Sequence, residues 1–320
     1  MRVYFVVQHK NQGSSILRGL QISNELNNLD IKSKVINPHE VPTNEENAIF
    51  FWVKNINLNI VKRCRKTSHH IYDIVDNFIY NKRMVDEAIK SKLLDRIIVN
   101  NSSMKLEFSK EYNISLDDIS VIHHNWDPRI ANAIKENQNN LTFGYLGSVA
   151  SLSHSHNFLH YKEIAEQYNI RFHDCEIGAD VTDLIKNKRK IPAFSWNKNA
   201  MSQAKIGFNC HISIREENSH LSKYKTSAKV VTASALGHNI ITTHEDAVKD
   251  ILPSEYPFIL TNTDLESVRK MFDLVKEDYN SNKSLWNRGL EIISCVKEEY
   301  SIANTIKNYT NLINVILQKI

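Results

Sequence analysis

Short apolar runs rich in β-branched residues alternate with longer amphipathic segments along most of this 320-residue chain. This alternation is typical of βα units wound around a parallel sheet, because helices bury each strand on both faces. Helices are expected between several of the strands, for example at 14–29 and 81–94. Six strands suffice for one doubly wound domain. The predicted strands of this first cycle are 2–8, 32–38, 48–55, 69–76, 95–101 and 119–125.

A polar, asparagine-rich stretch at 127–140 separates this first cycle from a second one, and we place the linker there. After the last predicted strand of the second cycle the chain is rich in helical patterns to its end. The α/β pattern therefore predicts two tandem Rossmann-like domains followed by C-terminal helices. The predicted strands are 141–148, 170–176, 191–196, 205–212 and 238–243, and the predicted helices are 156–169, 181–190, 197–204 and 225–237.

Charge and cysteine usage narrow the class of protein. The 40 basic and 36 acidic residues give a net charge of +4, which attracts anions mildly but is not the concentrated basic field of a dedicated nucleic-acid binder. The four cysteines are scattered singly and lack the spacing of a structural zinc site, so we expect a reducing cytoplasm and no metal site. No run of about eighteen apolar residues is present, so any membrane contact is expected at the surface only.

Several common enzyme motifs are absent from the sequence. The loop after the first predicted strand has one glycine and no GxGxxG, which argues against a dinucleotide-binding dehydrogenase. The chain also lacks a Walker A sequence, a GxSxG elbow and an HExxH pair. The commonest alternative α/β enzymes are therefore disfavoured.

One segment, "SAKVVTASALGHNIITT" at 227–243, combines a lysine, a small-residue helix face, a glycine and a β-branched strand. It resembles the signature of the GT-B glycosyltransferases known as family 4 or group 1. Weaker similarities are "NQGSSILRGLQISNEL" after the first strand, "FGYLGS" at 143–148 and "NAMSQAKIGFNC" before the signature, in the family's order. The resemblance implies a GT-B fold with a cleft between the domains. It implies an acceptor domain at 1–130, completed by a last helix at about 302–320, and a nucleotide-sugar donor domain at 141–301.

A donor of this kind carries phosphates, and a helix N-terminus is already a phosphate site because of its free N–H groups and partial positive charge. Lys225 and Lys229 lie one turn apart and would add positive charge there, while Gly237 would end the helix in a left-handed turn. An ordinary helix cap and packing face would produce the same pattern. The predicted donor-binding residues are Gly147, Ser148, Lys225, Lys229 and Thr232.

The sequence also departs from the family pattern. Members usually carry two glutamates around the signature helix, whereas the matching positions here are Lys225 and Thr232. The first loop of the second domain, "GYLGSVASLSHSHN", offers serines such as Ser148 and no cation where members have arginine and lysine. A donor with a single phosphate, such as a CMP-sugar, would need less positive charge, so a Kdo-like CMP-sugar transferase stays an alternative.

The acceptor side is expected at the carboxyl ends of the first domain's strands, where open α/β sheets place ligands. If the enzyme inverts configuration, Asp76 or His9 is the expected base; if it retains configuration, the donor phosphate itself can take the proton. A helix cap or solvated loop remains the simpler alternative for both residues. The predicted acceptor-side residues are Lys10, Gln12, Gly13 and His123.

The sequence thus predicts a cytoplasmic glycosyltransferase, peripheral at the inner face of the membrane if it contacts one, which moves a hexose from a nucleotide-sugar to a glycan or lipid-linked acceptor. The nucleotide-sugar is the co-substrate, and neither a bound cofactor nor a metal is expected. A phage-type DNA glycosyltransferase using the basic run 62–66 is one alternative. A non-catalytic, two-lobed nucleotide-sugar-binding protein is another. The histidines of "SHSHN", His154 and His156, lack partners typical of a metal site.

Overall fold

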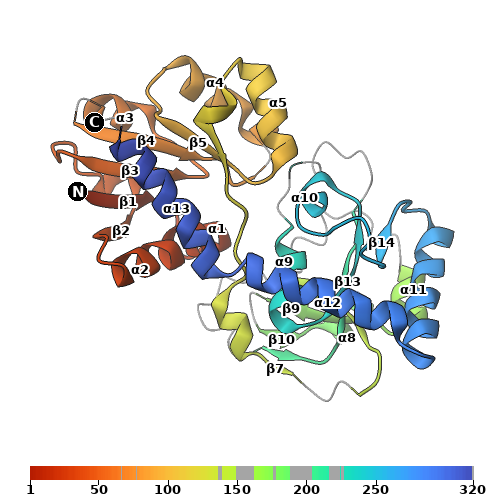
Figure 1. The fold of residues 1–320 in the computed structure, drawn as a ribbon. Helices are drawn as coiled ribbons and strands as arrows, with labels where there is room; N and C mark the ends of the chain where they lie inside the picture. Colours follow the sequence, from red (N-terminus) through yellow and green to blue (C-terminus); the bar gives the residue numbers. More distant parts are fainter. Residues whose placement is uncertain are drawn as a thin grey trace. The chain divides into compact units, whose positions relative to one another are not determined.

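The computed structural model of the chain divides into two compact units (Figure 1). The first comprises Met1–Asn125, Tyr300–Ile320 and the short segment Lys223–Thr226, of which Tyr224 is described. The second comprises Trp126–Ser222 and Ser227–Glu299. The structure describes residues 1–65, 67–76, 78–135, 139–148, 162–175, 178–187, 204–215, 224 and 227–318.

The sheet of the first unit contains β1 (Arg2–Val6), β2 (Ser33–Ile36), β3 (Ala48–Val53), β4 (Ser68–Asp73), β5 (Arg96–Val99) and β6 (Ile119–Val121). All its strands are parallel, in the order β2-β1-β3-β4-β5-β6. Each residue of β3 is buried, as expected for a central strand covered on both faces. The order of strands reverses between β1 and β3, so their carboxyl ends form the topological switch point of this sheet.

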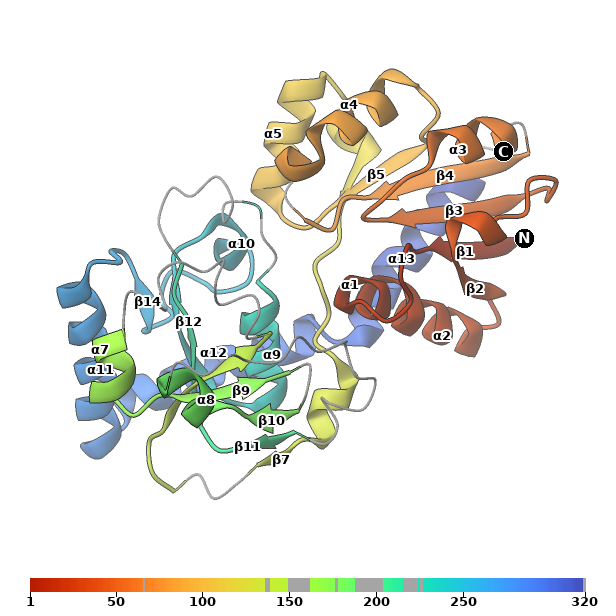
Figure 2. The ribbon, with the colours of Figure 1, turned by 180° about the vertical axis from the view of Figure 1, so that it is seen from behind.

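Helices cover both faces of this sheet (Figure 2). On one face, Tyr4 and Val6 of β1 pack with residues of α3, α4 and α5. On the other face, Val3 and Phe5 pack with residues of α2 and α13. Alternate side chains of β1 therefore point to opposite faces of the sheet and belong to two separate cores. The helical elements are α1 (Gly13–Ser15), the π-helix η1 (Ile16–Leu20), α2 (Gln21–Asn28), η2 (Pro38–Glu40), α3 (Leu58–Cys64), η3 (Phe78–Asn81), α4 (Lys82–Lys90), α5 (Ser102–Tyr112), η4 (Leu116–Asp118) and α13 (Ile302–Leu317).

The last helix, α13, packs back onto the first unit as predicted. It lies against α2 and contributes buried residues to the core beneath it. Tyr309 is completely buried and makes edge contacts with the stacked rings of Phe5 and Phe51. The core on one face of the N-terminal sheet is thus completed by residues that follow the second unit in the sequence.

The sheet of the second unit contains β8 (Phe143–Gly147), β9 (Arg171–Asp174), β10 (Ala179–Asp180), β12 (Cys210–Ser213), β13 (Asn239–Thr243) and β14 (Ile259–Leu260). Its order is β10-β9-β8-β12-β13-β14, and β10 alone among the paired strands of this sheet is antiparallel to its neighbour within the described ranges. A separate ribbon pairs β7 (Ile134–Lys135) with β11 (Lys205–Ile206). The switch point of the main sheet lies between β8 and β12.

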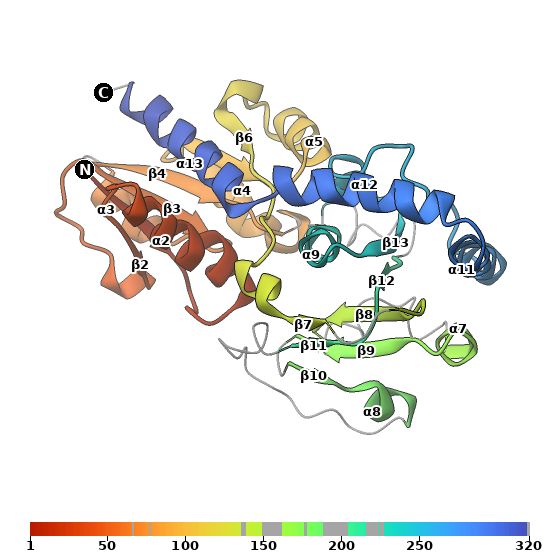
Figure 3. The ribbon, with the colours of Figure 1, turned by 60° about the horizontal axis from the view of Figure 1, so that its bottom comes forward.

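The helices of the second unit include α9, which carries the signature, and α12, which runs alongside α9 and β13 (Figure 3). Gly237 follows α9 with φ of +68°, and the N–H of His238 donates to the carbonyl of Ala233. The predicted left-handed turn at this glycine is confirmed. The elements are η5 (Pro128–Asn132), α7 (Lys162–Gln167), α8 (Thr182–Lys186), α9 (Ala228–Leu236), α10 (Asp246–Lys249), α11 (Leu265–Asn280) and α12 (Ser284–Glu299).

The predicted α/β class and the six strands of the first unit are confirmed. The strand predicted at 205–212 is wrong as a single element, because its first part pairs with β7 and its second part joins the main sheet. The predicted strand 191–196 and most of the predicted helix 197–204 lie outside the described residues. None of the described helices combines the length and the apolarity needed to cross a bilayer.

Candidate functional site

The second unit gathers charged and polar side chains where β8, β12 and β13 end. Arg215 lies two residues after β12 and forms an ion pair with Glu245, with 2.6 Å between Nη1 and Oε2. The Thr243 hydroxyl at the end of β13 donates to Glu245 Oε1 and accepts from the backbone N–H of Arg215. Side-chain exposures of 11% for Arg215 and 7% for Glu245 show that the pair is largely desolvated. The bonds at the ends of β12 and β13 therefore fix the position of the Arg215 guanidinium beside the switch point of this sheet.

A second cation, Lys229, lies over the ring of Tyr145, with its Nζ 4.9 Å from the ring centroid. Tyr145 belongs to β8 and is 3% exposed, and burial raises the pKa of its hydroxyl. Gly147 is needed for packing, because a Cβ at this position would stand 2.8 Å from the Tyr145 hydroxyl oxygen. The glycine predicted as a donor contact thus makes room for the ring that supports Lys229.

The helix α9 begins at this same strand edge without a side-chain cap. Its N-cap residue is Ser227, which makes no side-chain cap hydrogen bond. Ser227 is 6% exposed, and its Oγ is buried without a partner in the part of the chain that the structure describes. An unsatisfied buried hydroxyl costs free energy, and a helix N-terminus attracts anions through its unpaired N–H groups. The start of α9 is therefore suited to receive a phosphate.

Other predicted donor residues have different environments. The Thr232 hydroxyl donates to the carbonyl of Ala228, one turn back, at 2.7 Å, so its hydrogen goes to the helix itself. Ser148 follows β8 directly and is half-buried. Lys225, together with His154 and His156, lies outside the described residues. Arg215, Glu245 and Ser227 had no part in the predicted site. Arg215 and Glu245 belong to no motif, and Ser227 opens the signature segment as an uncharged residue that nothing in the sequence singles out.

In the first unit, the loop after β1 stands at the switch point. It carries the exposed residues His9 and Lys10, and Lys10 forms a 3.0 Å ion pair with Glu40. Gln12 precedes α1 as its N-cap and makes no side-chain cap hydrogen bond, and Gly13 is the first residue of that helix. These four predicted residues are neighbours in the sequence and share this one loop and the helix start that follows it.

The predicted base Asp76 forms an ion pair with Lys54, which follows β3. Lys54 Nζ lies 2.6 Å from Asp76 Oδ2, and the two side chains are 38% and 36% exposed. The Lys54 backbone adopts a left-handed φ of +69°, and its N–H donates to the carbonyl of Asp73. The pair lies at the carboxyl ends of β3 and β4 and is open to solvent.

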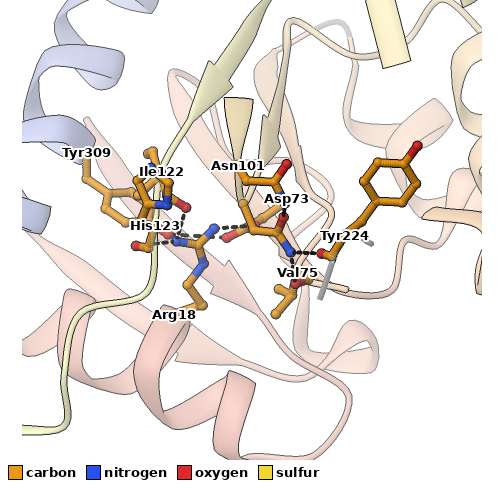
Figure 4. Close-up of polar contacts among 9 residues, drawn as sticks. Arg18, Asp73, Val75, Asn101, Ile122, His123, Tyr224 and Tyr309 are labelled. Atoms are coloured by element: carbon orange, nitrogen blue, oxygen red, sulfur yellow. Dashed lines mark hydrogen bonds and ion pairs between the residues drawn. The ribbon is translucent and has the colours of Figure 1, made fainter. Parts of the chain in front are cut away.

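Beneath this edge, Arg18 is fully buried in η1 (Figure 4). Its Nη2 lies 3.0 Å from Asp73 Oδ1, and its Nη1 donates to the carbonyls of Ile122 and His123. The Tyr309 hydroxyl donates to Asp73 Oδ2. Burial raises the pKa of the Asp73 carboxyl, and the Arg18 charge opposes that rise. This network ties together the helix after β1, the end of β4, the segment after β6, and α13.

The two histidines after β6 differ in their surroundings. His123 is half-buried and packs edge-on against the Tyr300 ring, at 5.3 Å between centroids. His124 is 7% exposed, and burial lowers the pKa of its ring well below the ordinary value, so the ring is neutral. The structure thus places the predicted acceptor residue His123 at the edge of the sheet and beside the buried Arg18 network.

No cluster of three or more potential metal-binding side chains is present among the residues that the structure describes. The sequence matches no family model and shows no significant similarity to a curated protein.

Solved structures nevertheless share the fold. A glycosyltransferase from Rickettsia africae ESF-5 superposes with a TM-score of 0.63 at 12% identity, covering 99% of this chain and 98% of that one. Anabaena HepE in complex with UDP-glucose gives 0.61 at 10% identity and covers 100% of both chains. An α-glucosyltransferase in complex with UDP and a 13-mer DNA containing an HMU base gives 0.57 at 10% identity, covering 98% and 99%. The chain has the GT-B fold of these glycosyltransferases, with two Rossmann-like domains.

Proposed function

We propose that the protein is a glycosyltransferase that uses a nucleotide-sugar donor. The observation that carries this proposal is the uncapped N-terminus of α9, where the buried Ser227 hydroxyl has no partner among the described residues. Lys229 lies in the first turn of the same helix and over the Tyr145 ring, and Arg215, after β12, is near enough to Tyr145 for its charge to lower the pKa of that hydroxyl against the effect of burial. Two cations, helix N–H groups and a hydroxyl together fit the phosphates of a nucleotide.

The donor we infer is a UDP-sugar carrying a hexose. Two of the structures that share the fold hold UDP-glucose or UDP. The first loop of the second domain lacks the cations that family members carry there. Arg215, which follows β12, places a guanidinium group at the same strand edge instead, and this weakens the argument for a donor with one phosphate. Because Lys229 and the N-terminus of α9 offer positive charge and N–H donors to the phosphates, we propose that catalysis needs no metal ion. Full activity in EDTA supports this point, and a strict requirement for manganese or magnesium would contradict it.

The first unit would bind the acceptor at the carboxyl ends of β1, β3 and β4. The Lys54–Asp76 pair offers a carboxylate that can accept a hydroxyl proton if the reaction inverts configuration, and His9 in the loop after β1 is the alternative base. If configuration is retained, the departing phosphate takes this proton. A net charge of +4 spread over the whole chain suits a glycan or lipid-linked acceptor better than a nucleic acid.

A DNA acceptor is the second candidate, because the fold is shared with an α-glucosyltransferase bound to DNA. Lys62 and Arg63 in the last turn of α3 would supply phosphate contacts, whereas Arg65 is held in an ion pair with Asp95. Binding of duplex DNA that weakens steeply between about 50 and 200 mM salt would favour this candidate. Weak binding with a shallow salt dependence would leave the glycan acceptor.

The test is a thermal-shift titration with CMP, UDP, GDP and UDP-glucose on the wild type and two matched variants. A ligand at a hundred times its Kd adds about 2.7 kcal/mol to the free energy of unfolding. Ser227→Ala removes the unpartnered hydroxyl, while Ser234→Ala on the same helix removes a buried hydroxyl that donates to the carbonyl of Val231.

We expect UDP to stabilise the wild type and Ser234→Ala, and to stabilise Ser227→Ala much less. A response to CMP alone would favour the CMP-sugar transferase. Tight binding of UDP-glucose without turnover on any acceptor would favour the two-lobed binding protein. An equal UDP response in all three proteins would remove the start of α9 as the donor site.

A further inference from the structure

The two edge strands of the first sheet differ in charge. The strand β2 forms one edge and carries the exposed Lys34, with Lys32 just before it. Charged side chains, lysine above all, keep an edge strand from pairing with another chain. The strand β6 forms the other edge, and none of its three residues, Ile119–Val121, is charged. The edge at β6 is therefore the less protected of the two.

The backbone of β6 presents unpaired groups along this edge. The N–H of Ile122 donates to the carbonyl of Val99, next to β6 in the sheet, so the alternation of a parallel ladder turns the N–H and C=O of Val121 away from β5. Neither group of Val121 makes a hydrogen bond with another described residue. Outward N–H and C=O groups of this kind are a template for an added strand.

An open groove of about 410 Å³ runs along the same edge, and all the residues that line it belong to the first unit. Leu116 of η4 and Val315 of α13 line it with large apolar side chains that are 42% and 39% exposed. Asn308 and Asn311 of α13 add polar groups. The groove thus combines apolar surface with an open strand edge, as a docking surface for a further strand requires.

Two side chains of opposite charge line this groove at the two ends of β6. Asp117 lies in η4, two residues before β6 begins, and Lys105 lies in the first turn of α5, which begins soon after β5 ends. Since β5 and β6 are parallel, Asp117 is at the amino end of β6 and Lys105 at its carboxyl end. Because η4 contacts α5, both charges are on the α5 side of the sheet. Neither forms an ion pair within the part of the chain that the structure describes.

We propose that the β6 edge is an interface between two copies of this chain, joined by antiparallel pairing of the two β6 strands about a two-fold axis. Such pairing brings the amino end of each strand to the carboxyl end of the other. Asp117 of each copy then faces Lys105 of the partner subunit, so opposite charges meet twice. At the axis, the N–H of Val121 donates to the carbonyl of the partner subunit's Val121, and the reverse bond forms as well.

A second copy is the occupant we infer because the charges of this edge are complementary to themselves under the two-fold rotation. An unrelated peptide would have to supply the matching charges itself. The inference is independent of the proposed donor site and of the reaction.

The test is sedimentation equilibrium of the full chain between about 1 and 100 µM. Asp117→Lys and Lys105→Asp each place like charges at both contacts, and the double variant restores opposite charges with their positions exchanged. Lys110→Asp is the matched control, since Lys110 is exposed on the same helix and does not line the groove. Val121→Pro removes the N–H at the axis, and proline is tolerated on an edge strand where the N–H faces outward. Circular dichroism shows whether each variant is folded.

We expect the wild type and Lys110→Asp to reach twice the mass of one chain within this range. Each single reversal should weaken the dimer at least about a hundredfold, and the double variant should return the dimer Kd to within about threefold of the wild type. Val121→Pro should be a folded monomer, and if it does not fold, the charge variants still decide the question.

Three results overturn the proposal. The first is a wild type that stays monomeric at about 100 µM, which would leave the edge to an extended segment of another protein. The second is a dimer that the single reversals weaken no more than Lys110→Asp does. The third is a double variant as weak as the single ones, because the charges would then not meet across the interface.

Discussion

The two units build the carboxyl edges of their sheets in opposite ways. In the first, Arg18, Asp73 and Tyr309 are buried and bonded to one another, and the exposed charges Lys54 and Asp76 are paired. In the second, the helix at the edge starts with a buried hydroxyl that has no partner in the described residues. The edge of the first sheet is thus held by a buried ion pair, although Arg18 Nε has no partner among the described residues, whereas the edge of the second sheet has an unpaired hydroxyl at a helix start, where we propose that a ligand binds.

The largest effect is expected from breaking the buried ion pair at the edge of the first sheet. Asp73→Asn leaves the fully buried Arg18 without its counter-charge, so the free energy of unfolding should fall by about 3–5 kcal/mol. Urea unfolding followed by circular dichroism measures this loss. The double variant Arg18→Met with Asp73→Asn should recover part of it, because no uncompensated charge remains. A loss below about 1 kcal/mol in the single variant would show that the pair does not hold the edge together.

Acid should weaken both units through buried neutral histidines. His70 in the first unit accepts from the Trp52 indole at Nδ1, so its Nε2 hydrogen faces the Ser68 hydroxyl, and burial lowers its pKa to about 4. In the second unit, His211 and His238 share a 3.1 Å hydrogen bond, and burial lowers the pKa of His238 to about 3. These rings stay neutral while the unfolded chain takes up protons below its pKa of about 6.5. The contribution of these neutral rings to the free energy of unfolding is therefore fully present above pH 6.5, and it is lost as the pH drops towards the pKa values of the folded protein.

Below pH 6.5, the free energy of unfolding should fall by about 1.4 kcal/mol per pH unit for each such histidine. Urea unfolding at pH 7.5 and 5.5 measures it. His70→Gln keeps an acceptor for Trp52 and a donor for Ser68, so it should reduce the pH dependence by about 1.4 kcal/mol between those values. The exposed His39→Gln is the control and should leave the pH dependence as it is. Equal pH dependence in both variants would contradict the assignment of His70.

A smaller effect is expected at the C-terminal end of α9. Unlike the N-terminal end, it is capped by the chain itself. Gly237 has a left-handed φ of +68°, and a Cβ added at this position would meet no atom within 4 Å. The cost of Gly237→Ala is therefore conformational, at about 1 kcal/mol. Gly237→Asn should cost less, since asparagine tolerates this conformation. Thermal unfolding of the two variants checks the order, and a larger loss for asparagine would point to packing instead of φ.

The smallest effect is expected at the uncapped end. Replacing an N-cap serine by alanine usually costs about 0.5–2 kcal/mol. Ser227→Ala should cost less than about 0.5 kcal/mol without nucleotide, because Ser227 makes no side-chain cap bond. Chemical unfolding without ligand measures this. A loss in the usual range would mean that Ser227 caps α9 and that its hydroxyl is not held ready for a phosphate.

Much of the architecture could be predicted because strand burial and helix amphipathicity are local properties of the sequence. The six strands of the first sheet and the turn at Gly237 followed from apolar runs and one glycine. The segment 205–212 misled this reasoning because Asn209 interrupts it. The Asn209 side chain accepts from the N–H of Thr142, and its own N–H donates to the carbonyl of Thr142, so the chain enters the main sheet only at Cys210.

The site was less predictable because its key residues act through tertiary partners. Arg18 lies in a helical segment where a lone arginine is ordinarily exposed, and nothing in the sequence shows that Asp73 faces it. Arg215 belongs to no motif, and Glu245, with which it forms an ion pair, is thirty residues away in the sequence. Lys229 was predicted because it lies one turn from Lys225 on the signature helix, and its role stays a prediction.

The packing of α13 imposes a delay during synthesis, because the first sheet is made long before the helix that covers one of its faces. The last strand of the first sheet, β6, ends at Val121, but the helix that buries one of its faces begins at Ile302, after the whole second unit. At about 5–20 residues per second, a ribosome needs roughly 10–40 s to cover that interval. During this time the apolar face of β1 and β3 has no cover from Tyr309. A nascent chain of this protein should therefore engage chaperones until its final helix emerges.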